Sequence, residues 1–380
     1  MDLGYNTEQQ ILRDSADRFF AARYNYQTSC SISESYAGFS QKMWTEFAKL
    51  GWLALPFPVE DGGIGAGAVE LSILMEALGK HLVLEPYLAT ILLGGGLLSL
   101  LGSSSERAEV LPAVIDGKCQ LAFAHEDKNE ATTATQNASD YILRGRKRTV
   151  LGAAAADILF VSAKLPNGKL GVFKIHKGIR GVMLHPYIMV DGRRAANVYF
   201  DNVALPSDAL IGGNEDAEDA MQTVIDRAIS ALSADAIGAI AAIMETTLDY
   251  TKTRVQFGKP IAKFQALQHR LVQMKIHEEE ARAASLFATL SLDRPAIDRI
   301  RAVCGAKAKI GRCARSIYQN AIQLHGGIGT TKELALGGYA KRLIAYETMF
   351  GSTREHLKRY SSIIASPELA AKSLMIAPTN

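Results

Sequence analysis

Apolar residues recur along the chain at two spacings, and the change of spacing divides the chain into three segments. Near the start they follow one another at helical intervals from Leu12 to Phe20, and a longer helical stripe runs from Met221 to Ile243. Between about residues 119 and 213 the apolar residues gather instead in short runs typical of β-strands. The order helices, strands, helices predicts an α+β protein.

These segments predict the domains and the strands of the middle one. We expect an N-terminal all-helical domain over residues 1–118, a middle β-barrel or sandwich domain over 119–213, a C-terminal four-helix-bundle domain over 214–364, and a tail over 365–380. The predicted strands are 141–147, 158–163, 170–175, 182–187 and 197–200. The residues Pro166, Asn167 and Gly168 predict a hairpin between the second and third of these strands.

Local signals predict where two helices begin. Thr7 with Gln10 has the spacing of a capping box, and Ser352 with Glu355 has the same spacing directly after Gly351. The glycine itself is typical of a helix terminator.

Composition agrees with a soluble globular protein. Of the 380 residues 48% are hydrophobic, and the net charge of +3, with Lys and Arg scattered, argues against nucleic-acid binding. The most apolar run, Tyr87 to Leu101, is shorter than the roughly 20 residues of a membrane span. No secretory signal opens the chain, so we expect a cytoplasmic protein without a membrane span. No zinc-type spacing relates the four cysteines, so no metal site is expected at Cys30, Cys119, Cys304 or Cys313.

Two glycine-containing motifs in the last segment carry the clearest chemistry. The first runs from Arg254 to Ile261 and the second from Gln323 to Gly329. Each places a cationic or amide side chain beside glycines, which let the backbone approach a ligand closely. That combination suits a bound diphosphate, although either motif alone is also typical of a helix end followed by a turn.

The two motifs resemble the C-terminal half of the acyl-CoA dehydrogenases, FAD enzymes that desaturate acyl-CoA thioesters between the α and β carbons. The resemblance covers nearly the whole chain. Three segments are similar to one branch of the family, the small subunits of heteromeric pimeloyl-CoA and steroid-side-chain acyl-CoA dehydrogenases, which pair with a larger subunit: 84–90, 190–196 and 339–343. The resemblance implies FAD as cofactor, an acyl-CoA as substrate, and electron-transfer flavoprotein or a similar acceptor as partner.

The resemblance also implies which residues meet the flavin. Seven positions match family residues that line or approach FAD: Arg254, Phe257, Gln268, Gln323, Gly326, Gly327 and Ser352. Four of them match positions that reach across a subunit interface: Arg254, Phe257, Gln323 and Gly327. Phe257 is equally explained as a core residue, and a helix N-cap already explains Ser352.

The family's proton acceptor is missing from both of its usual places. In the family a Glu removes the α proton. The commoner place is directly before the glycine that precedes the last helix, and here Phe350 stands there. The other place falls at Ala228 or Ile229, with Asp226 just upstream. Neither position carries a carboxylate unless the register shifts to Asp226.

Two other acids are candidates for the missing base. Asp235 falls beside the apolar stripe of its helix, where burial raises the pKa of a carboxyl group as a base requires. The same position is typical of an acid at the edge of the stripe that is solvated or paired with a Lys or Arg. Glu347, one turn before Gly351, is the second candidate, and a solvated acid at a helix end explains it as well.

Much of the family's own flavin cradle is also missing from the β segment. Thr149 and Leu151 stand where members carry an aromatic residue and a hydroxyl, and residues 123–129 lack the Gly-Ser pair that contacts phosphate. The chain therefore keeps the residues that would reach the flavin of a neighbouring subunit. It lacks much of the flavin-binding part of its own β segment. One half of a heteromer has this asymmetry.

Three functions follow as hypotheses. The leading one is a subunit of an FAD-dependent acyl-CoA dehydrogenase whose catalytic base comes from a larger partner subunit. The second is a non-catalytic stabilising partner that binds neither FAD nor CoA by itself. The third is a related flavin enzyme of the monooxygenase type.

Overall fold

The computed structural model describes residues 4–137, 140–213 and 216–365, which form two compact units. The first, here the helical unit, takes the residues up to 31, residues 68–83 and the residues from 229 onward. The second, here the sheet unit, takes residues 32–67 and 84–228. The domain boundaries predicted from the sequence stay a prediction, because each unit draws on several separate stretches of chain.

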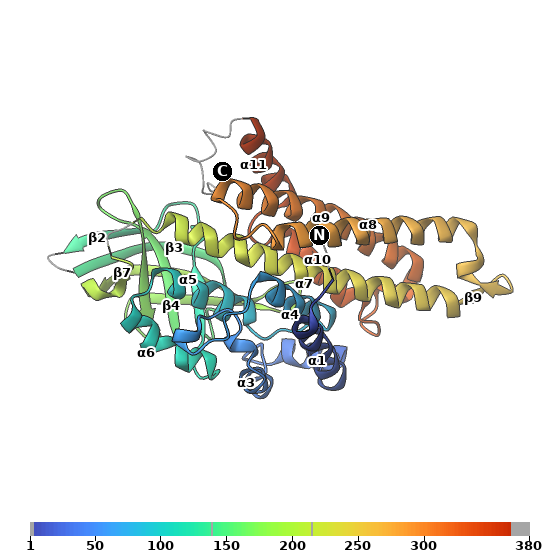
Figure 1. The fold of residues 1–380 in the computed structure, drawn as a ribbon, viewed down its shortest axis with the longest axis horizontal. Helices are drawn as coiled ribbons and strands as arrows, with labels where there is room; N and C mark the ends of the chain where they lie inside the picture. Colours follow the sequence, from blue (N-terminus) through green and yellow to red (C-terminus); the bar gives the residue numbers. More distant parts are fainter. Residues whose placement is uncertain (1–3, 138–139, 214–215, 366–380) are drawn as a thin grey trace. The chain divides into compact units, whose positions relative to one another are not determined.

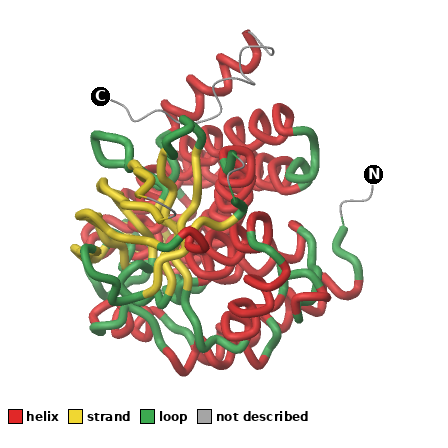
Figure 2. The backbone as a smooth tube through the Cα atoms, turned by 90° about the vertical axis from the view of Figure 1, so that its left-hand side faces the viewer, coloured by secondary structure: helices red, strands yellow, loops and turns green. Residues whose placement is uncertain are grey.

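One eight-stranded sheet makes up the β part of the sheet unit (Figure 2). Its strands are β1 (Leu121–Ala124), β2 (Thr133–Asn137), β3 (Asp140–Leu151), β4 (Ile158–Lys164), β5 (Leu170–His176), β6 (Val182–Ile188), β7 (Arg194–Leu205) and β8 (Leu210–Ile211). Their order is β6-β7-β3-β2-β4-β5-β8, and β1 pairs with β4 in parallel. The five predicted strands are confirmed, and β3 and β7 extend beyond the predicted ends.

Three strands were not predicted, and their composition explains the omission. β1 has four residues, all buried, so it is too short to show a period. β2 is polar, and Ala134 is its one buried residue. β8 has two residues. Tertiary pairing rather than local pattern makes these segments strands.

The hairpin predicted between β4 and β5 is confirmed. Lys164 pairs with Leu170 in an antiparallel ladder, and the Leu165 N–H donates to the Lys169 carbonyl at 2.9 Å. Gly168 has a φ of 84°, which explains the glycine at this turn.

Short helices complete the sheet unit: α3 (Gln41–Lys49), η1 (Trp52–Ala54), η2 (Val59–Asp61), η3 (Leu88–Gly95), α5 (Gly96–Leu101), α6 (Ser104–Ile115) and η4 (Ser207–Ala209). The apolar run that begins at Tyr87 forms η3, a π-helix, and continues into α5. Every residue of η3 is buried, so this apolar run is part of the core. A Cβ at Gly95 would collide with the ring of Phe57, so the glycine allows this close packing.

Long helices build the helical unit (Figure 1). They are α1 (Thr7–Arg23), α4 (Ala68–Lys80), α8 (Gln265–Thr289), α9 (Ala296–His325), α10 (Leu336–Thr348) and α11 (Thr353–Ala365), with β9 (Val255–Gln256), β10 (Lys259–Pro260), η5 (Ile261–Lys263) and η6 (Gly326–Thr330) between them. Two further helices, α2 (Tyr26–Glu34) and α7 (Glu218–Thr253), continue from one unit into the other.

Two glycines bring α4 and α7 into backbone contact. A Cβ at Gly79 of α4 would collide with the carbonyl oxygen of Asp235 on α7. A Cβ at Gly238 of α7 would collide with the carbonyl oxygen of Glu76 on α4. Each helix therefore has a glycine where it contacts the backbone of the other helix. This contact sets the position of Asp235 relative to α4.

The predicted helix starts are confirmed in one case and shifted in the other. Ser352 and Glu355 form the capping box at α11, since each side chain accepts the other residue's backbone N–H. At α1 the prediction was wrong by one residue: the cap is Asn6 with Gln9, and Thr7 is the first helical residue. An Asn side chain caps as well as a Thr hydroxyl, so the spacing alone does not decide between them.

By length and composition, α7 is the one helix among the described residues that is long and apolar enough to cross a membrane. In this structure 83% of its most apolar stretch is buried inside the protein. The core helix of a folded domain has the same composition.

Candidate cofactor and substrate site

The first glycine motif forms an exposed hairpin at the end of α7. β9 and β10 pair through Gln256 with Lys259, and the two residues between them, Phe257 and Gly258, have φ values of 50° and 78°. Positive φ at both positions is the geometry of a type I′ turn, which glycine accepts readily and a bulky residue rarely adopts. Phe257 is 91% exposed, so its reading as a core residue was wrong. The hairpin therefore exposes an aromatic ring at its tip.

Arg254 lies at the base of this hairpin. Its backbone N–H donates to Tyr250 and its carbonyl accepts from Ile261, both at 2.8 Å, so the main chain is held at both ends. The guanidinium is exposed and forms no ion pair with any residue that the structure describes. Gln268 lies nearby at the start of α8 and donates from its amide nitrogen to the Ala262 carbonyl at 3.0 Å.

The second glycine motif ends α9 and lies against the first. Gly326 has a φ of 65° and a ψ of −143°, a region open essentially to glycine alone. Added Cβ atoms at Gly326 and Gly327 would meet nothing within 4 Å, so the backbone there faces open space. Gln323 is exposed beside them. This backbone can approach a ligand closely, as the sequence predicted.

Tyr250 and His325 join the two motifs, and the sequence analysis missed both. The Tyr250 hydroxyl donates to the His325 carbonyl at 3.2 Å, and their rings stack at 4.4 Å between centroids. Tyr250 stands one helical turn before Arg254, so the two share a helix face. That spacing is the signal in the sequence that could have identified it.

Phe350 forms a tight turn between α10 and α11. It is 5% exposed and has a φ of 56°, and Gly351 follows with a φ of 99°. The buried ring Nε2 of His356 donates to the Phe350 carbonyl at 2.8 Å. Burial lowers the pKa of His356 to about 4, so the ring is neutral at pH 7 and holds this turn as a hydrogen-bond donor.

The two polar residues beside this turn serve as helix caps. Ser352 caps α11, as described above; its predicted contact with the cofactor stays a prediction. Both carboxylate oxygens of Glu347 accept from Thr353, one from the backbone N–H at 3.1 Å and one from the hydroxyl at 2.7 Å. Glu347 is half-buried, and its candidacy as a base is weakened because both of its oxygens are engaged.

Asp235 forms a buried ion pair with Arg342 of α10. Asp235 is 1% exposed and Arg342 is 2% exposed. Nε and Nη2 of the guanidinium contact the two carboxylate oxygens at 3.0 Å and 3.1 Å, and Nη2 also donates to the Val83 carbonyl at 2.6 Å. The sequence left open whether Asp235 is solvated or paired with a Lys or Arg. The structure shows that it is paired with an arginine and buried. A carboxylate clamped in this way argues against Asp235 as the base.

The alternative family position on α7 is apolar and buried, as the sequence indicated. Ala228 is fully buried and Ile229 is 1% exposed. Asp226, the acid that a shifted register would use, is 1% exposed and accepts from the Gln222 side chain at 2.7 Å. Asp226 therefore takes part in a buried hydrogen bond one turn along its own helix.

In the sheet unit, charged side chains occupy the loop where the family's phosphate contacts would fall. Lys147 is 1% exposed, and its Nζ lies 2.7 Å from Asp127. The same Asp127 oxygen accepts from the Thr132 hydroxyl at 2.7 Å, and Glu126 pairs with Arg148 at 3.1 Å. Two carboxylates in a loop that also lacks the Gly-Ser pair make it unsuited to a diphosphate, which repels them.

Thr149 and Leu151, which replace the family's aromatic and hydroxyl, lie at an irregularity of β3. The register with β7 shifts between Lys147 and Val150, and Thr149 has a φ of 51°. The Thr149 hydroxyl contacts the Tyr187 hydroxyl at 3.2 Å, and Leu151 is 7% exposed. Neither offers the flat aromatic cover that the family uses.

One buried lysine was not predicted as a functional residue. Burial lowers the pKa of Lys307 to about 7, against the opposing charges of Glu347 and Glu355. A lysine with such a pKa has the chemistry of a proton acceptor. Its Nζ, however, donates to the Tyr346 carbonyl and lies 3.9 Å from the centre of the Tyr346 ring, and the residue is 1% exposed. We therefore assign Lys307 no contact with a substrate.

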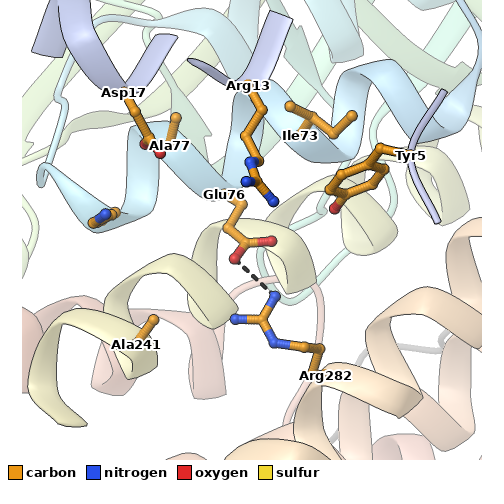
Figure 3. Close-up of a pocket in the computed structure, with 9 residues that line it drawn as sticks. Tyr5, Arg13, Asp17, Ile73, Glu76, Ala77, Ala241 and Arg282 are labelled. Atoms are coloured by element: carbon orange, nitrogen blue, oxygen red, sulfur yellow. Dashed lines mark hydrogen bonds and ion pairs between the residues drawn. The ribbon is translucent and has the colours of Figure 1, made fainter. Parts of the chain in front are cut away.

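A separate pocket of about 320 Å³ opens between helices of the helical unit (Figure 3). It is lined by Tyr5, Arg13, Asp17, Ile73, Glu76, Ala77, Lys80, Ala241 and Arg282. Glu76 accepts from Arg282 at 2.8 Å across the pocket. None of the residues predicted to meet the flavin lines this pocket, so it is distinct from the glycine motifs.

Comparisons with known proteins decide the family. The model of the acyl-CoA dehydrogenase N-terminal domain matches residues 6–118, and that of the C-terminal domain matches residues 218–361. The acyl-CoA dehydrogenase FadE12 of Mycobacterium tuberculosis is 30% identical over 350 residues, which cover 86% of this chain and 88% of FadE12. This chain belongs to the acyl-CoA dehydrogenase family.

Two solved structures share the fold over nearly their whole length. A variant of the steroid ACAD Tcur3481-Tcur3483 is 26% identical with a TM-score of 0.86, covering 95% of this chain and 99% of that one. The FAD complex of PigA is 26% identical with a TM-score of 0.87, covering 96% and 99%. The predicted α+β architecture, with helices, a middle sheet and further helices, is confirmed.

Membership of the acyl-CoA dehydrogenase family confirms the predicted activity class and cofactor. The family carries out FAD-dependent dehydrogenation of acyl-CoA, and FAD is the cofactor that this fold serves. The residues of the helical unit fit that cofactor, because Arg254 and the backbone at Gly326 and Gly327 face open space. The loop at Asp127 in the sheet unit does not fit FAD, because Asp127 is paired with Lys147.

Proposed function

We propose that this chain is one subunit of a heteromeric acyl-CoA dehydrogenase and that a larger partner subunit supplies the catalytic base. The observation that carries the proposal is Phe350. It stands at the family's base position, is buried, and has a side chain that cannot accept a proton. The nearest acid along the chain, Glu347, is engaged by Thr353.

The hairpin supports a role at a neighbour's flavin. Arg254 is exposed without an ion pair among the described residues, and Phe257 is displayed at 91% exposure on a strained turn. Strained and exposed features of this kind gather at functional surfaces. In our proposal the guanidinium binds the diphosphate of FAD held mainly by the partner, and the Gly326–Gly327 backbone lies against the same cofactor.

The sheet unit supports the other half of the proposal. Lys147, Asp127 and Thr132 form one hydrogen-bonded network where a phosphate would need free donors. The chain keeps Arg254 and its hairpin, but the Lys147–Asp127 network occupies its own phosphate-binding loop. A flavin site would then need residues from a partner subunit. When bound there, FAD would supply the acceptor for the hydride that leaves the β carbon of the substrate.

The substrate class follows from the branch that the chain resembles. We propose a long dicarboxylic, aromatic or steroid-derived acyl-CoA, with electron-transfer flavoprotein or a similar protein as the electron acceptor. The steroid ACAD Tcur3481-Tcur3483, which carries a paired name, supports a steroid-derived substrate and a two-component enzyme.

Flavin content tests the proposal. We expect the chain purified alone to hold well under one FAD per chain, and the complex co-expressed with the neighbouring coding sequence to hold FAD stably. Flavin absorbance after denaturation, divided by chain concentration, measures both. One FAD per copy of the isolated chain would contradict the proposal. Absence of flavin from both preparations would favour the non-catalytic stabilising partner.

Arg254→Ala is expected to weaken FAD retention in the assembled complex by about 1–3 kcal/mol, roughly 5- to 150-fold in affinity, because a charge-assisted contact is lost. Retention is measured by flavin fluorescence released on dilution. Arg254→Lys keeps the positive charge but loses the paired donors of the guanidinium. Its FAD retention should fall between those of the wild type and Arg254→Ala. Lys252→Ala, two residues earlier and also exposed, is the matched control. Equal retention in Arg254→Ala and wild type would remove the cross-interface role.

A further inference from the structure

Three side chains with metal-binding atoms converge between α8 and α9, away from both glycine motifs. His277 and Glu280 lie one turn apart on α8, and Cys313 faces them from α9, which packs along α8 (Figure 1). Their donor atoms all lie within 4.8 Å of one another. Nδ1 of His277 is 3.1 Å from Oε2 of Glu280, and the Cys313 Sγ is 3.6 Å from that oxygen and 4.0 Å from that nitrogen.

This triangle has the dimensions of one face of a zinc tetrahedron. Zinc binds His nitrogen and carboxylate oxygen at about 2.0–2.1 Å and thiolate sulfur at about 2.3 Å, which sets the nitrogen and oxygen about 3.3 Å apart and the sulfur about 3.5–3.6 Å from each. The observed separations depart from these values by a few tenths of an ångström. Side-chain rotations of that size need no backbone movement.

Neighbouring residues hold two of the donors in position. Lys309 binds Oε1 of Glu280 at 2.8 Å, which leaves Oε2 facing His277 and Cys313. The side-chain amide nitrogen of Gln273 lies 3.3 Å from Nε2 of His277. With the proton on Nε2 and the amide turned so that its oxygen accepts, Nδ1 keeps its lone pair for a metal. Such outer partners are typical of metal-bound histidines.

We propose that His277, Glu280 and Cys313 bind one Zn²⁺ ion, with a water molecule as the fourth ligand. On binding, the Cys313 thiol loses its proton to solvent and forms a sulfur–metal bond. The ligand set selects zinc over magnesium and calcium, which take oxygen donors. The bound ion links α8 to α9 across the helical unit.

Cysteine spacing gives no sign of this site. Cys313 has no second cysteine or histidine at a zinc-type interval, because its partners lie more than 30 positions earlier on another helix. The sequence predicted no metal site. Our proposal differs, because the packing of α8 against α9 brings together residues that are distant in the sequence.

Cobalt substitution tests the proposal without any need for enzyme activity. The full chain, reduced with a phosphine and stripped with a chelator, is titrated with Co²⁺ and then with Zn²⁺. We expect one Co²⁺ per chain, a thiolate-to-cobalt absorption band in the near ultraviolet, tetrahedral d–d bands in the visible, and displacement of all of them by one equivalent of Zn²⁺.

Variants assign the ligands. Cys313→Ser should abolish the thiolate band and lower affinity at least 100-fold, His277→Gln should lower it similarly, and Gln273→Ala should lower it about 10-fold as an outer partner. His277 and Gln273 lie near the surface, so these variants are expected to fold, with circular dichroism as the check. Cys304→Ser and His269→Gln, on the same two helices but outside the cluster, are matched controls and should bind as wild type does. Wild-type affinity in Cys313→Ser, or no cobalt bound by wild type at micromolar concentration, would overturn the proposal.

Discussion

Asp235→Asn is expected to lower the free energy of unfolding by about 3–5 kcal/mol, because the change leaves the Arg342 guanidinium buried without its compensating charge. Both residues are at most 2% exposed, so water does not replace the lost partner. An ion pair on the surface would give about 0–1 kcal/mol. Urea denaturation followed by helical circular dichroism measures the difference.

The paired variant separates charge from packing. Asp235→Leu combined with Arg342→Met is expected to regain most of the lost stability, since apolar residues of similar volume often replace a buried ion pair without loss. Asp249→Asn, an exposed acid on the same helix, should change stability by less than about 0.5 kcal/mol and serves as the control. A loss below 1 kcal/mol for Asp235→Asn would mean that the pair is not buried in solution.

The same variant tests chemistry apart from stability. In our proposal the Asp235–Arg342 pair is structural, so Asp235→Asn that remains folded within the complex keeps most of its turnover. A fall of several orders of magnitude in the folded complex would instead make Asp235 the base. Stability and turnover are thus two separate readouts of one substitution.

The sequence predicted the parts of the fold that local rules determine. The capping box at Ser352 and the hairpin at Gly168 depend on residues a few positions apart, and both are confirmed. The two glycine motifs were recognised for the same reason, since positive φ and close approach are properties of single residues.

Long-range pairing is what the sequence could not provide. Asp235 meets Arg342 across 107 positions, and Tyr250 meets His325 across 75. The sequence left Glu347 open between a base and a solvated acid, yet it caps a helix whose first residue lies six positions later. A one-dimensional pattern places a residue on a face of its own helix but does not say which residue of another helix it meets.

This distinction also explains why Phe350 was informative and Asp235 was not. A residue type that cannot perform a reaction excludes a role wherever it folds, so Phe350 removes the family base at once. A residue type that can perform the reaction decides nothing until its partners are known. The carboxylate of Asp235 turned out to be engaged on both oxygens.

The isolated chain is expected to oxidise acyl-CoA thioesters about 10²–10⁴-fold more slowly than the complex, because a positioned general base contributes a factor of this size. Phe350→Glu restores a carboxylate at the family position. We expect it to leave the isolated chain slow, because the Lys147–Asp127 network still fills the phosphate loop of its own cradle. Dye-linked oxidation of the acyl-CoA, normalised to bound flavin, measures all three proteins.

Phe350→Gln is the control for size and polarity without a charge, and we expect it to leave the isolated chain as slow as Phe350→Glu does. Phe350 is 5% exposed on a strained turn, so both variants cost stability and need comparison at equal folded fraction. If Phe350→Glu alone brought the isolated chain to the rate of the complex, the chain would lack only the base for acyl-CoA oxidation. The partner would then not be required. If the wild-type chain reached that rate unaided, the proton acceptor would lie within it, and the buried acids Asp226 and Asp235 would be the first residues to replace.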